Sequence, residues 1–365
     1  MAGIYIHIPF CKQACHYCNF HFVTSLHHKN ELVAALLREL EIRISYPGGE
    51  KIETIYLGGG TPSLCSPTEL DQIVSTIKAN YILSDAAEIT MEVNPDDITN
   101  QSLLKWKTIG INRLSIGVQS FHEEDLEWMN RAHTAKQAIE SLLLAKQHFD
   151  NLSIDLIYGT PTLTNEKWKQ NVETAIQLGI PHLSCYALTV EPKTPLDKMI
   201  RLKKAENIST DQQAEQFILL MDWLRSAGYE HYEISNFSLP GRRSRHNTSY
   251  WQGKKYLGIG PSAHSFDGNS RQWNLANNAR YIESLNEGKL LFEIETLTET
   301  QKRNEYIMTS LRTLEGMDLA LAGKEVSDRA AKFLDSGHLV KKAGHLLLTD
   351  KGKLLADGIA ADLFY

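Results

Sequence analysis

The chain has 365 residues, of which 42% are hydrophobic and 22% are charged, and its formal net charge at pH 7 is −6. The length suits one large domain with a smaller one, and no apolar run reaches the roughly 20 residues of a membrane span. We also find no amino-terminal signal peptide, so we expect a cytoplasmic protein without a transmembrane segment. The negative charge argues against a nucleic-acid partner, because broad phosphate binding needs a clustered basic surface.

Short hydrophobic runs alternate with segments of helical periodicity along the first half of the chain. The strand-like runs cover residues 4–8, 52–57, 88–93, 113–118, 152–157 and 183–188. Apolar residues at helical spacing cover residues 30–44, 66–80, 134–149 and 166–178. Strands that alternate with helices predict a parallel sheet with right-handed crossovers. The predicted fold class is therefore α/β, a partial (β/α)6 barrel.

A C-x3-C-x2-C loop formed by Cys11, Cys15 and Cys18 follows the first strand-like run. Three thiolates on one loop can hold three corners of a four-iron cube and leave the fourth iron open to another ligand. The other two of the five cysteines, Cys65 and Cys185, lie in or beside apolar runs. We expect those two to be small buried side chains.

The alternative for the three cysteines of the loop is a structural zinc ion, with His7, His16 or His21 as the fourth ligand. Structural zinc sites usually draw their ligands from two separated pairs, whereas these thiols share one loop. An iron–sulfur cluster in a reducing compartment is therefore the preferred interpretation.

Polar or glycine-rich residues stand at the carboxyl ends of the later predicted strands, where parallel barrels carry their functional residues. In chain order they are the Gly58-Gly59-Gly60-Thr61-Pro62 turn, Glu92 with Asn94, Gln119, Asp155, and Tyr186 with Ala187. Glycines have no Cβ, so the backbone of the turn can approach a polar ligand closely. The turn therefore suits the amino and carboxylate groups of an amino-acid-like cofactor.

The pattern becomes irregular from about residue 228 and then changes again near residue 290. The last part predicts helix, short strand, turn, short strand and helix, the order of a winged-helix-type module. We therefore divide the chain into a barrel (1–228), a connecting region that completes the core (229–290) and a carboxy-terminal module (291–365).

Together these motifs resemble those of radical S-adenosylmethionine (SAM) proteins. More narrowly, the chain is similar to the oxygen-independent coproporphyrinogen III oxidase group and, within it, to the heme chaperone branch. The likeness covers nearly the whole chain. It includes YIHIPFC at 5–11, LGGGTPS at 57–63, EVNP at 92–95, IGVQSF at 116–121, DLIYG at 155–159 and the carboxy-terminal module.

The resemblance implies a [4Fe-4S] cluster on the three cysteines of the loop, with SAM on the open iron. It also implies a set of groups around the cofactors, namely Tyr5, Gly59, Gly60, Thr61, Glu92, Gln119, Arg131, Asp155 and Ala187. In this set Arg131 would pair with the carboxylate of SAM. The alternatives are that Arg131 forms a surface ion pair and that Asp155 caps a helix.

Two departures from the oxidase pattern bear on function. The oxidases resemble C-x3-C-x2-C-x-C and carry an amino-terminal arm, whereas this chain has Phe20 at the fourth cysteine position and starts its first strand by residue 4. The chaperone branch shows an H-N-x-x-Y-W motif, which residues 246–251 match in full.

The resemblance to the chaperone branch implies heme as a further ligand. His246 would be an axial ligand to its iron, and Arg242, Arg243 and Arg245 would pair with the propionates. The alternative is that His246 is a hydrogen-bonded loop residue and that the neighbouring Tyr250 and Trp251 are core.

We therefore expect a heme chaperone that delivers heme to heme-requiring, respiratory proteins, and we assign no catalytic residues. The alternative within the group is the oxidase, which forms protoporphyrinogen IX by radical decarboxylation of coproporphyrinogen. A winged-helix nucleic-acid binder with structural zinc is the third interpretation, and the near balance of charge in the carboxy-terminal module disfavours it. Peripheral association with a membrane and a homodimer both stay open.

Overall fold

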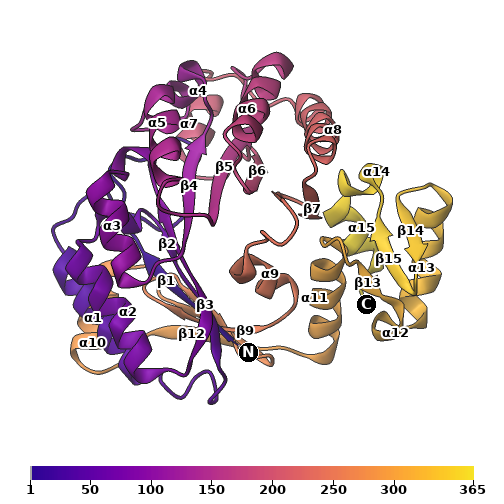
Figure 1. The fold of residues 1–365 in the computed structure, drawn as a ribbon. Coiled ribbons are helices and arrows are strands. Elements are labelled where there is room, and N and C mark those ends of the chain that lie inside the picture. The colour runs from indigo at the N-terminus through magenta and orange to yellow at the C-terminus, as the bar shows by residue number, and fades with distance from the viewer. Residues whose placement is uncertain (1) are drawn as a thin grey trace.

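The computed structural model describes residues 2–365 and contains one sheet of twelve strands and one sheet of three strands (Figure 1). Six strands of the large sheet are parallel neighbours in chain order. They are β1 (Ala2–Ile8), β2 (Ile52–Gly59), β3 (Leu83–Val93), β4 (Arg113–Gln119), β5 (Leu152–Tyr158) and β6 (His182–Ala187). This arrangement confirms the predicted α/β partial barrel.

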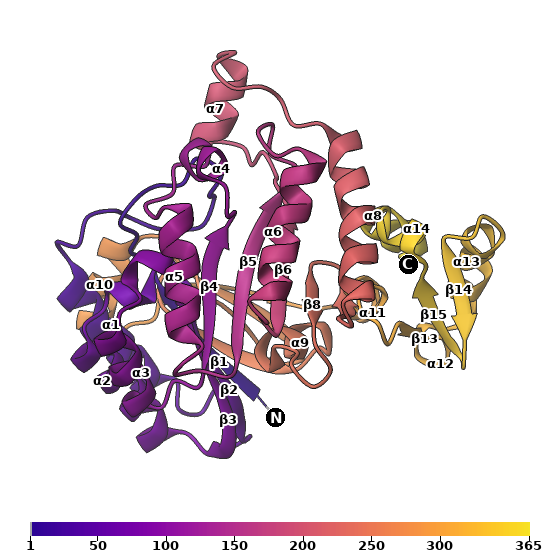
Figure 2. The ribbon, with the colours of Figure 1, turned by 45° about the horizontal axis from the view of Figure 1, so that its top comes forward.

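Helices cover the outer face of the six parallel strands (Figure 1). They are α1 (Lys29–Ile42), α2 (Pro67–Asn80), α3 (Asn100–Ile109), α5 (Ala135–Ala145), α6 (Asn165–Gln177) and α8 (Thr210–Ser226). The short helices α4 (Glu123–Trp128) and α7 (Pro195–Arg201) lie beyond the carboxyl ends of the strands (Figure 2). Local sequence fixes several starts: Ser66 accepts the N–H of Glu69 and Pro67 is the first residue of α2. Thr99 caps α3 in the same way.

The large sheet continues beyond both ends of the parallel set. At the β1 side it adds β9 (Lys255–Ile259), β10 (His264–Phe266), β11 (Ser270–Asn274) and β12 (Phe292–Thr296), and at the β6 side β8 (Asn236–Ser238) and β7 (Glu230–Glu233). Strand β9 is parallel to β1, so β1 has a partner on each side. Helix α9 (Arg245–Trp251) contacts β2 at the open side of the barrel, and α10 (Asn278–Asn286) packs on α1.

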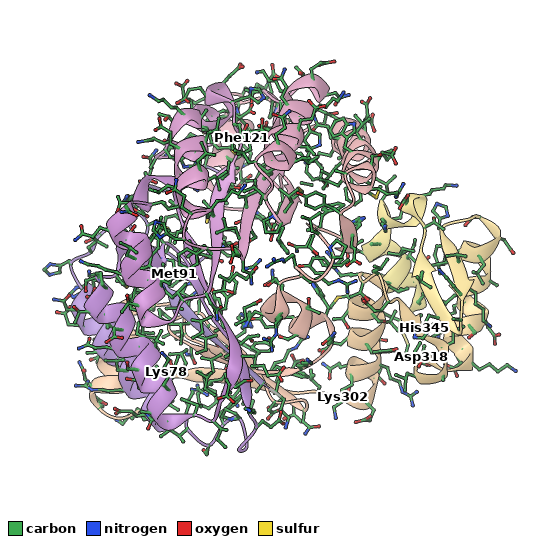
Figure 3. All side chains as sticks on the ribbon, viewed as in Figure 1. Lys78, Met91, Phe121, Lys302, Asp318 and His345 are labelled. Carbon is green, nitrogen blue, oxygen red and sulfur yellow. The ribbon has the colours of Figure 1, made fainter. Side chains whose placement is uncertain are left out.

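The carboxy-terminal module has a hydrophobic core of its own, which runs from Ile307 to Leu363. Its elements are α11 (Glu299–Leu311), β13 (Met317–Asp318), α12 (Leu319–Ala322), α13 (Lys324–Asp335), β14 (Leu339–Lys342), β15 (His345–Leu348), α14 (Asp350–Lys353) and α15 (Ala356–Leu363). Figure 2 shows this module at one side of the barrel, and Asp318 and His345 mark it in Figure 3. The ion pair between Arg225 of α8 and Asp350 joins the two parts.

The predicted division at residues 228 and 290 stays a prediction. Strand β12 lies beyond residue 290, yet it forms an antiparallel ladder with β11 and so belongs to the large sheet. Among the described residues, no helix has both the length and the apolar character that a membrane crossing requires.

Candidate functional site

The cysteine loop follows the carboxyl end of β1, and hydrogen bonds to other parts of the chain fix both its base and its tip. The N–H of Cys11 donates to the carbonyl of Val23 over 3.0 Å at the base. At the tip, the side chain of Asn130 donates to the carbonyl of Ala14 over 2.7 Å. Cys11, Cys15 and Cys18 are all free thiols and partly exposed. The backbone therefore holds the loop in place while its three thiols stay available to a ligand.

Arg131 connects this loop to the neighbouring strand ends. Its guanidinium donates to Cys15 Sγ over 3.2 Å, to Asn94 Oδ1 over 2.7 Å and to the carbonyl of Gly117 over 2.8 Å. Asn94 in turn donates to Thr61 Oγ1 over 3.0 Å. No carboxylate among residues 2–365 pairs with Arg131, and its Nε is a buried donor without a partner. The geometry is thus not that of a surface ion pair.

The glycine turn packs directly on the end of β1. Gly59 has a φ of 99°, which favours glycine. A Cβ on Gly60 would lie 2.6 Å from the carbonyl oxygen of Phe10 and 2.7 Å from that of Ile8, closer than side chains can approach. The N–H of Thr61 donates to the carbonyl of Phe10 over 2.6 Å. The absence of side chains therefore brings the turn against the start of the cysteine loop.

Two carboxyl groups lie on neighbouring parts of the barrel interior. Glu92 accepts hydrogen bonds from Tyr56 Oη at 2.7 Å and from the N–H of Gly59 at 3.0 Å. Burial raises the pKa of Glu92 to about 7, with a further contribution from the charge of Asp155. Burial likewise raises the pKa of Asp155 to about 6. Near neutral pH these carboxyls can therefore act as hydrogen-bond donors as well as acceptors.

Three further residues that the resemblance implied, Tyr5, Gln119 and Ala187, lie on β1, β4 and β6. The Tyr5 ring stacks on Tyr56 with centroids 6.0 Å apart. Gln119 is buried at the end of β4 with a φ of 69°, where the β4–β5 register shifts. Ala187 is exposed at the end of β6, the neighbour of the strand that carries Asp155.

Two polar residues of the site were not assigned a role from the sequence. Asn94 bridges Arg131 and Thr61, and Tyr56 binds Glu92. The alternation of β2 gives a signal for Tyr56, because residues two apart in a strand share a face and Gly58 follows at that spacing.

The three histidines of the zinc alternative are held by protein groups. His7 Nε2 contacts the carbonyl of His21 at 2.9 Å, His16 Nδ1 contacts the carbonyl of Trp128 at 2.9 Å, and His21 Nε2 contacts Asn278 Oδ1 at 2.7 Å. Within the described part of the chain, no three His, Cys, Asp or Glu side chains are arranged to hold a single metal ion. These contacts give the zinc interpretation no support.

His246 lies in the core rather than at an open site. Its ring is buried, and its two nitrogens contact Thr54 Oγ1 and Tyr250 Oη, each at 2.8 Å. The ring also stacks on Tyr56, with centroids 5.0 Å apart. In this conformation neither nitrogen is free for a heme iron, so the geometry corresponds to the alternative of a hydrogen-bonded residue.

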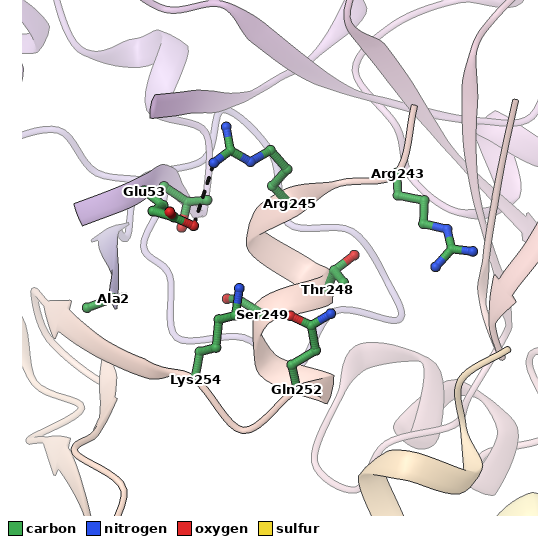
Figure 4. A pocket seen from close by; sticks show the side chains of 9 residues that line it. Ala2, Glu53, Arg243, Arg245, Thr248, Ser249, Gln252 and Lys254 are labelled. Atoms are coloured by element: carbon green, nitrogen blue, oxygen red, sulfur yellow. Dashed lines mark ion pairs between the residues drawn. The ribbon is translucent and has the colours of Figure 1, made fainter. Parts of the chain in front are cut away.

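The arginines before His246 face the other end of the barrel. Arg243 pairs with Glu315 at 2.6 Å and with Glu230 at 3.3 Å, and Arg245 pairs with Glu53 at 3.7 Å. Both arginines line a pocket of about 240 Å³ near the amino-terminal ends of β1 and β2 (Figure 4). The cysteine loop follows the opposite end of β1, so these arginines and the loop belong to different ends of the strands.

Comparison with known proteins identifies the family of this chain. The Radical SAM superfamily pattern matches residues 5–175. The heme chaperone HemW of Bacillus subtilis (strain 168) is 32% identical over 378 residues, which cover 98% of this chain and 98% of that protein. The chain belongs to the HemW family. The HemW protein of Escherichia coli (strain K12) is 31% identical over 373 residues, covering 98% of this chain and 96% of its own length.

Membership of the HemW family confirms the resemblance drawn from the motifs. Among solved structures, coproporphyrinogen III oxidase (HemN) from Escherichia coli, described as a radical SAM enzyme, matches with a TM-score of 0.86. The match covers 100% of this chain and 90% of that chain at 23% identity. At 23% identity, this match shows that the chain and HemN share a fold.

Proposed function

We propose that this protein is a cytoplasmic heme chaperone that binds a [4Fe-4S] cluster, SAM and heme and passes heme to heme-requiring proteins. The observation that carries the proposal is the similarity, over 98% of the chain, to HemW proteins that are named heme chaperones. A thiol-held cluster also suits the reducing conditions of the cytoplasm.

The donor set of the cysteine loop fits an iron–sulfur cluster. Cys11, Cys15 and Cys18 are free, partly exposed and held on one fixed loop. Arg131 aims an N–H at Cys15 Sγ, and hydrogen bonds to sulfur tune such clusters. A [4Fe-4S] cluster held by these thiols, once reduced, would be able to supply one electron to the sulfonium of SAM.

The strand ends beside the loop fit an amino-acid-like cofactor. The buried Nε of Arg131 lacks a partner, and a carboxylate is the group that a guanidinium N–H binds best. Glu92 lies beside the glycine turn and suits the amino group or the ribose of SAM. The other groups proposed around SAM are Tyr5, Gly59, Gly60, Thr61, Gln119, Asp155 and Ala187.

Anaerobic reconstitution with iron and sulfide, followed by two assays on one sample, tests the proposal. One assay is a heme difference spectrum, and the other is product analysis with coproporphyrinogen III. We expect a heme complex and no protoporphyrinogen IX. Robust formation of protoporphyrinogen IX would replace the chaperone function with the oxidase function, and failure to bind heme would remove the chaperone function.

A further inference from the structure

A cavity of about 680 Å³ lies between the barrel and the carboxy-terminal module, and much of its wall is aromatic. We call it the aromatic cavity and define it by Phe20, Tyr250, Trp251, Tyr256, Phe266 and Tyr306. These residues come from the cysteine loop, α9, β9, β10 and α11. Of these elements, α9, β9 and α11 lie at the open side of the barrel (Figure 1). Its volume falls within the roughly 300–1,000 Å³ of small-molecule sites.

We propose that the aromatic cavity is the heme site and that His264 is the axial ligand to the heme iron. This inference rests on the proposed function. It assigns the iron to His264 and not to His246, the histidine of the H-N-x-x-Y-W motif, whereas Tyr250 and Trp251 of that motif line the cavity.

Two histidines line the aromatic cavity, and they differ in availability. The ring nitrogens of His7 contact Tyr5 Oη at 3.1 Å and the carbonyl of His21 at 2.9 Å. His264, on β10, is exposed and its ring has no hydrogen-bond partner among the described residues. The Trp273 ring stacks beside it at 6.1 Å between centroids and limits its orientation. His264 therefore offers a positioned and unoccupied imidazole to the cavity.

The protonation state of His264 suits a metal ligand. Partial burial and the positive charge of Arg271 lower its pKa below the usual value. At neutral pH the ring is therefore in the neutral form that binds metals.

The charges of the aromatic cavity favour a ligand that carries a carboxylate. The lining contains three cations, Lys254, Arg271 and Lys302, and one carboxylate, Glu305. Arg271 pairs with Glu305 at 2.9 Å, and Lys302 pairs at 3.0 Å with Glu299, which lies outside the lining. Lys254 has no ion pair or hydrogen bond through its ammonium group among residues 2–365. A propionate would supply the negative charge that Lys254 lacks.

The wall of the cavity includes an exposed aromatic side chain. Phe20 is 68% exposed to solvent and lines the cavity, so its ring is available to pack against a bound ligand. It stands where the oxidase pattern has a cysteine, so this departure from the pattern adds an apolar face to the cavity. Flat aromatic faces pack well on a flat macrocycle.

Heme titration of the anaerobically reconstituted protein tests the ligand, with ferric heme as the probe. His264→Ala is expected to shift the Soret band and to weaken heme binding about tenfold or more, since even the loss of an outer-shell partner costs about 10–100-fold. Added imidazole should restore the parent spectrum, and cluster iron and sulfide should stay at the parent value. His345→Ala, which removes a histidine of β15 (Figure 3), is the matched control and should behave as the parent.

A second variant, Lys254→Glu, tests the cavity independently of the ligand. We expect weaker heme binding with an unchanged Soret position, because the charge acts on a propionate and not on the iron. Identical spectra and affinities in the parent and His264→Ala would overturn the ligand assignment. The ligand assignment would also be overturned if a folded His246→Phe variant lost the Soret band of the parent while His264→Ala kept it. If the parent binds no heme, the proposed function fails first.

Discussion

The guanidinium of Arg131 donates a hydrogen bond to the sulfur of Cys15 over 3.2 Å. The same group holds Asn94, which holds Thr61 of the glycine turn. One side chain therefore joins the proposed cluster loop to the proposed SAM site. We treat Arg131 as a residue that positions both parts as well as one that binds the SAM carboxylate.

Replacing Arg131 with lysine should separate these roles. An ammonium group cannot reproduce the planar fork, so one or more of the three acceptors loses its partner. We expect about tenfold weaker SAM binding, which corresponds to about 1.4 kcal/mol, while iron and sulfide per chain stay near the parent value. Equilibrium dialysis with SAM and iron analysis measure the two effects. Arg201→Lys, on the exposed face of α7, is the control, and equal SAM affinity in both variants would remove Arg131 from the site.

The cysteines of the loop should differ sharply from the two outside it. Cys15→Ala is expected to abolish the reconstituted cluster, because two thiolates cannot hold three corners of the cube. Cys185→Ala, in the buried part of β6, should keep the full iron content and lose only about 1 kcal/mol of stability for the lost packing. Iron and sulfide analysis with the visible spectrum decides the outcome. Stoichiometric zinc without sulfide in anaerobically isolated protein would contradict the cluster assignment.

The raised pKa of Glu92 predicts a pH-dependent stability. Glu92 has a pKa of about 7 in the folded chain, against about 4.3 when unfolded, so folding takes up a proton between these values. The stabilising effect is therefore complete below about pH 4.3 and is lost as the pH rises through about 7. Tyr5, Tyr56 and Asp155 face this carboxyl, and Asp155 adds an effect of the same sign.

Urea unfolding of the parent and Glu92→Gln at about pH 5 and about pH 8 measures this dependence. We expect the stability of the variant relative to the parent to rise with pH, by up to about 3 kcal/mol. Samples without SAM should be used, since the cofactor is proposed to contact Glu92. A pH-independent difference between the two proteins would show that Glu92 titrates normally.

The close packing of the glycine turn predicts a severe effect of one methyl group. Gly60→Ala places a Cβ 2.6 Å from the carbonyl oxygen of Phe10, so β1 or the turn must move. We expect a loss of about 1–3 kcal/mol in stability and weaker SAM binding. Gly358→Ala, in α15 with open space around the added atom, is the matched control and should stabilise by up to about 1 kcal/mol. Thermal unfolding with and without SAM compares the two variants, and similar behaviour of both would exclude a steric role for Gly60.

Much of the barrel could be predicted from the sequence because its signals are local. Hydrophobic runs predicted β1 to β6, and caps such as Ser66 and Thr99 fixed helix starts. Helix α8 was not predicted, and its buried Gln216 illustrates why: a polar side chain on the inner face weakens the apolar pattern. The pairing of β9 with β1 was also not predicted, because it joins segments about 250 residues apart and leaves no local pattern.

The candidate site divides in the same way. The three cysteines and the strand-end residues could be picked out from their spacing and their positions in the sequence, and their binding roles stay predictions. The state of His246 did not, because a motif gives residue types but not the hydrogen bonds to Thr54 and Tyr250 that occupy the ring. His264 was not predicted as a ligand from the sequence, because the cavity that its ring faces is formed by segments far apart in the chain.

The position of β1 between β2 and β9 has a consequence for folding during synthesis. The strand that leads into the cysteine loop is made first, yet one of its two neighbours is Lys255–Ile259. On the ribosome, β1 therefore keeps an unpaired edge until about two thirds of the chain has emerged, and such long-range pairing is slow. Metal loading of the loop should accordingly follow the emergence of β9, and truncated chains that end before β9 should expose β1 to chaperones or to aggregation.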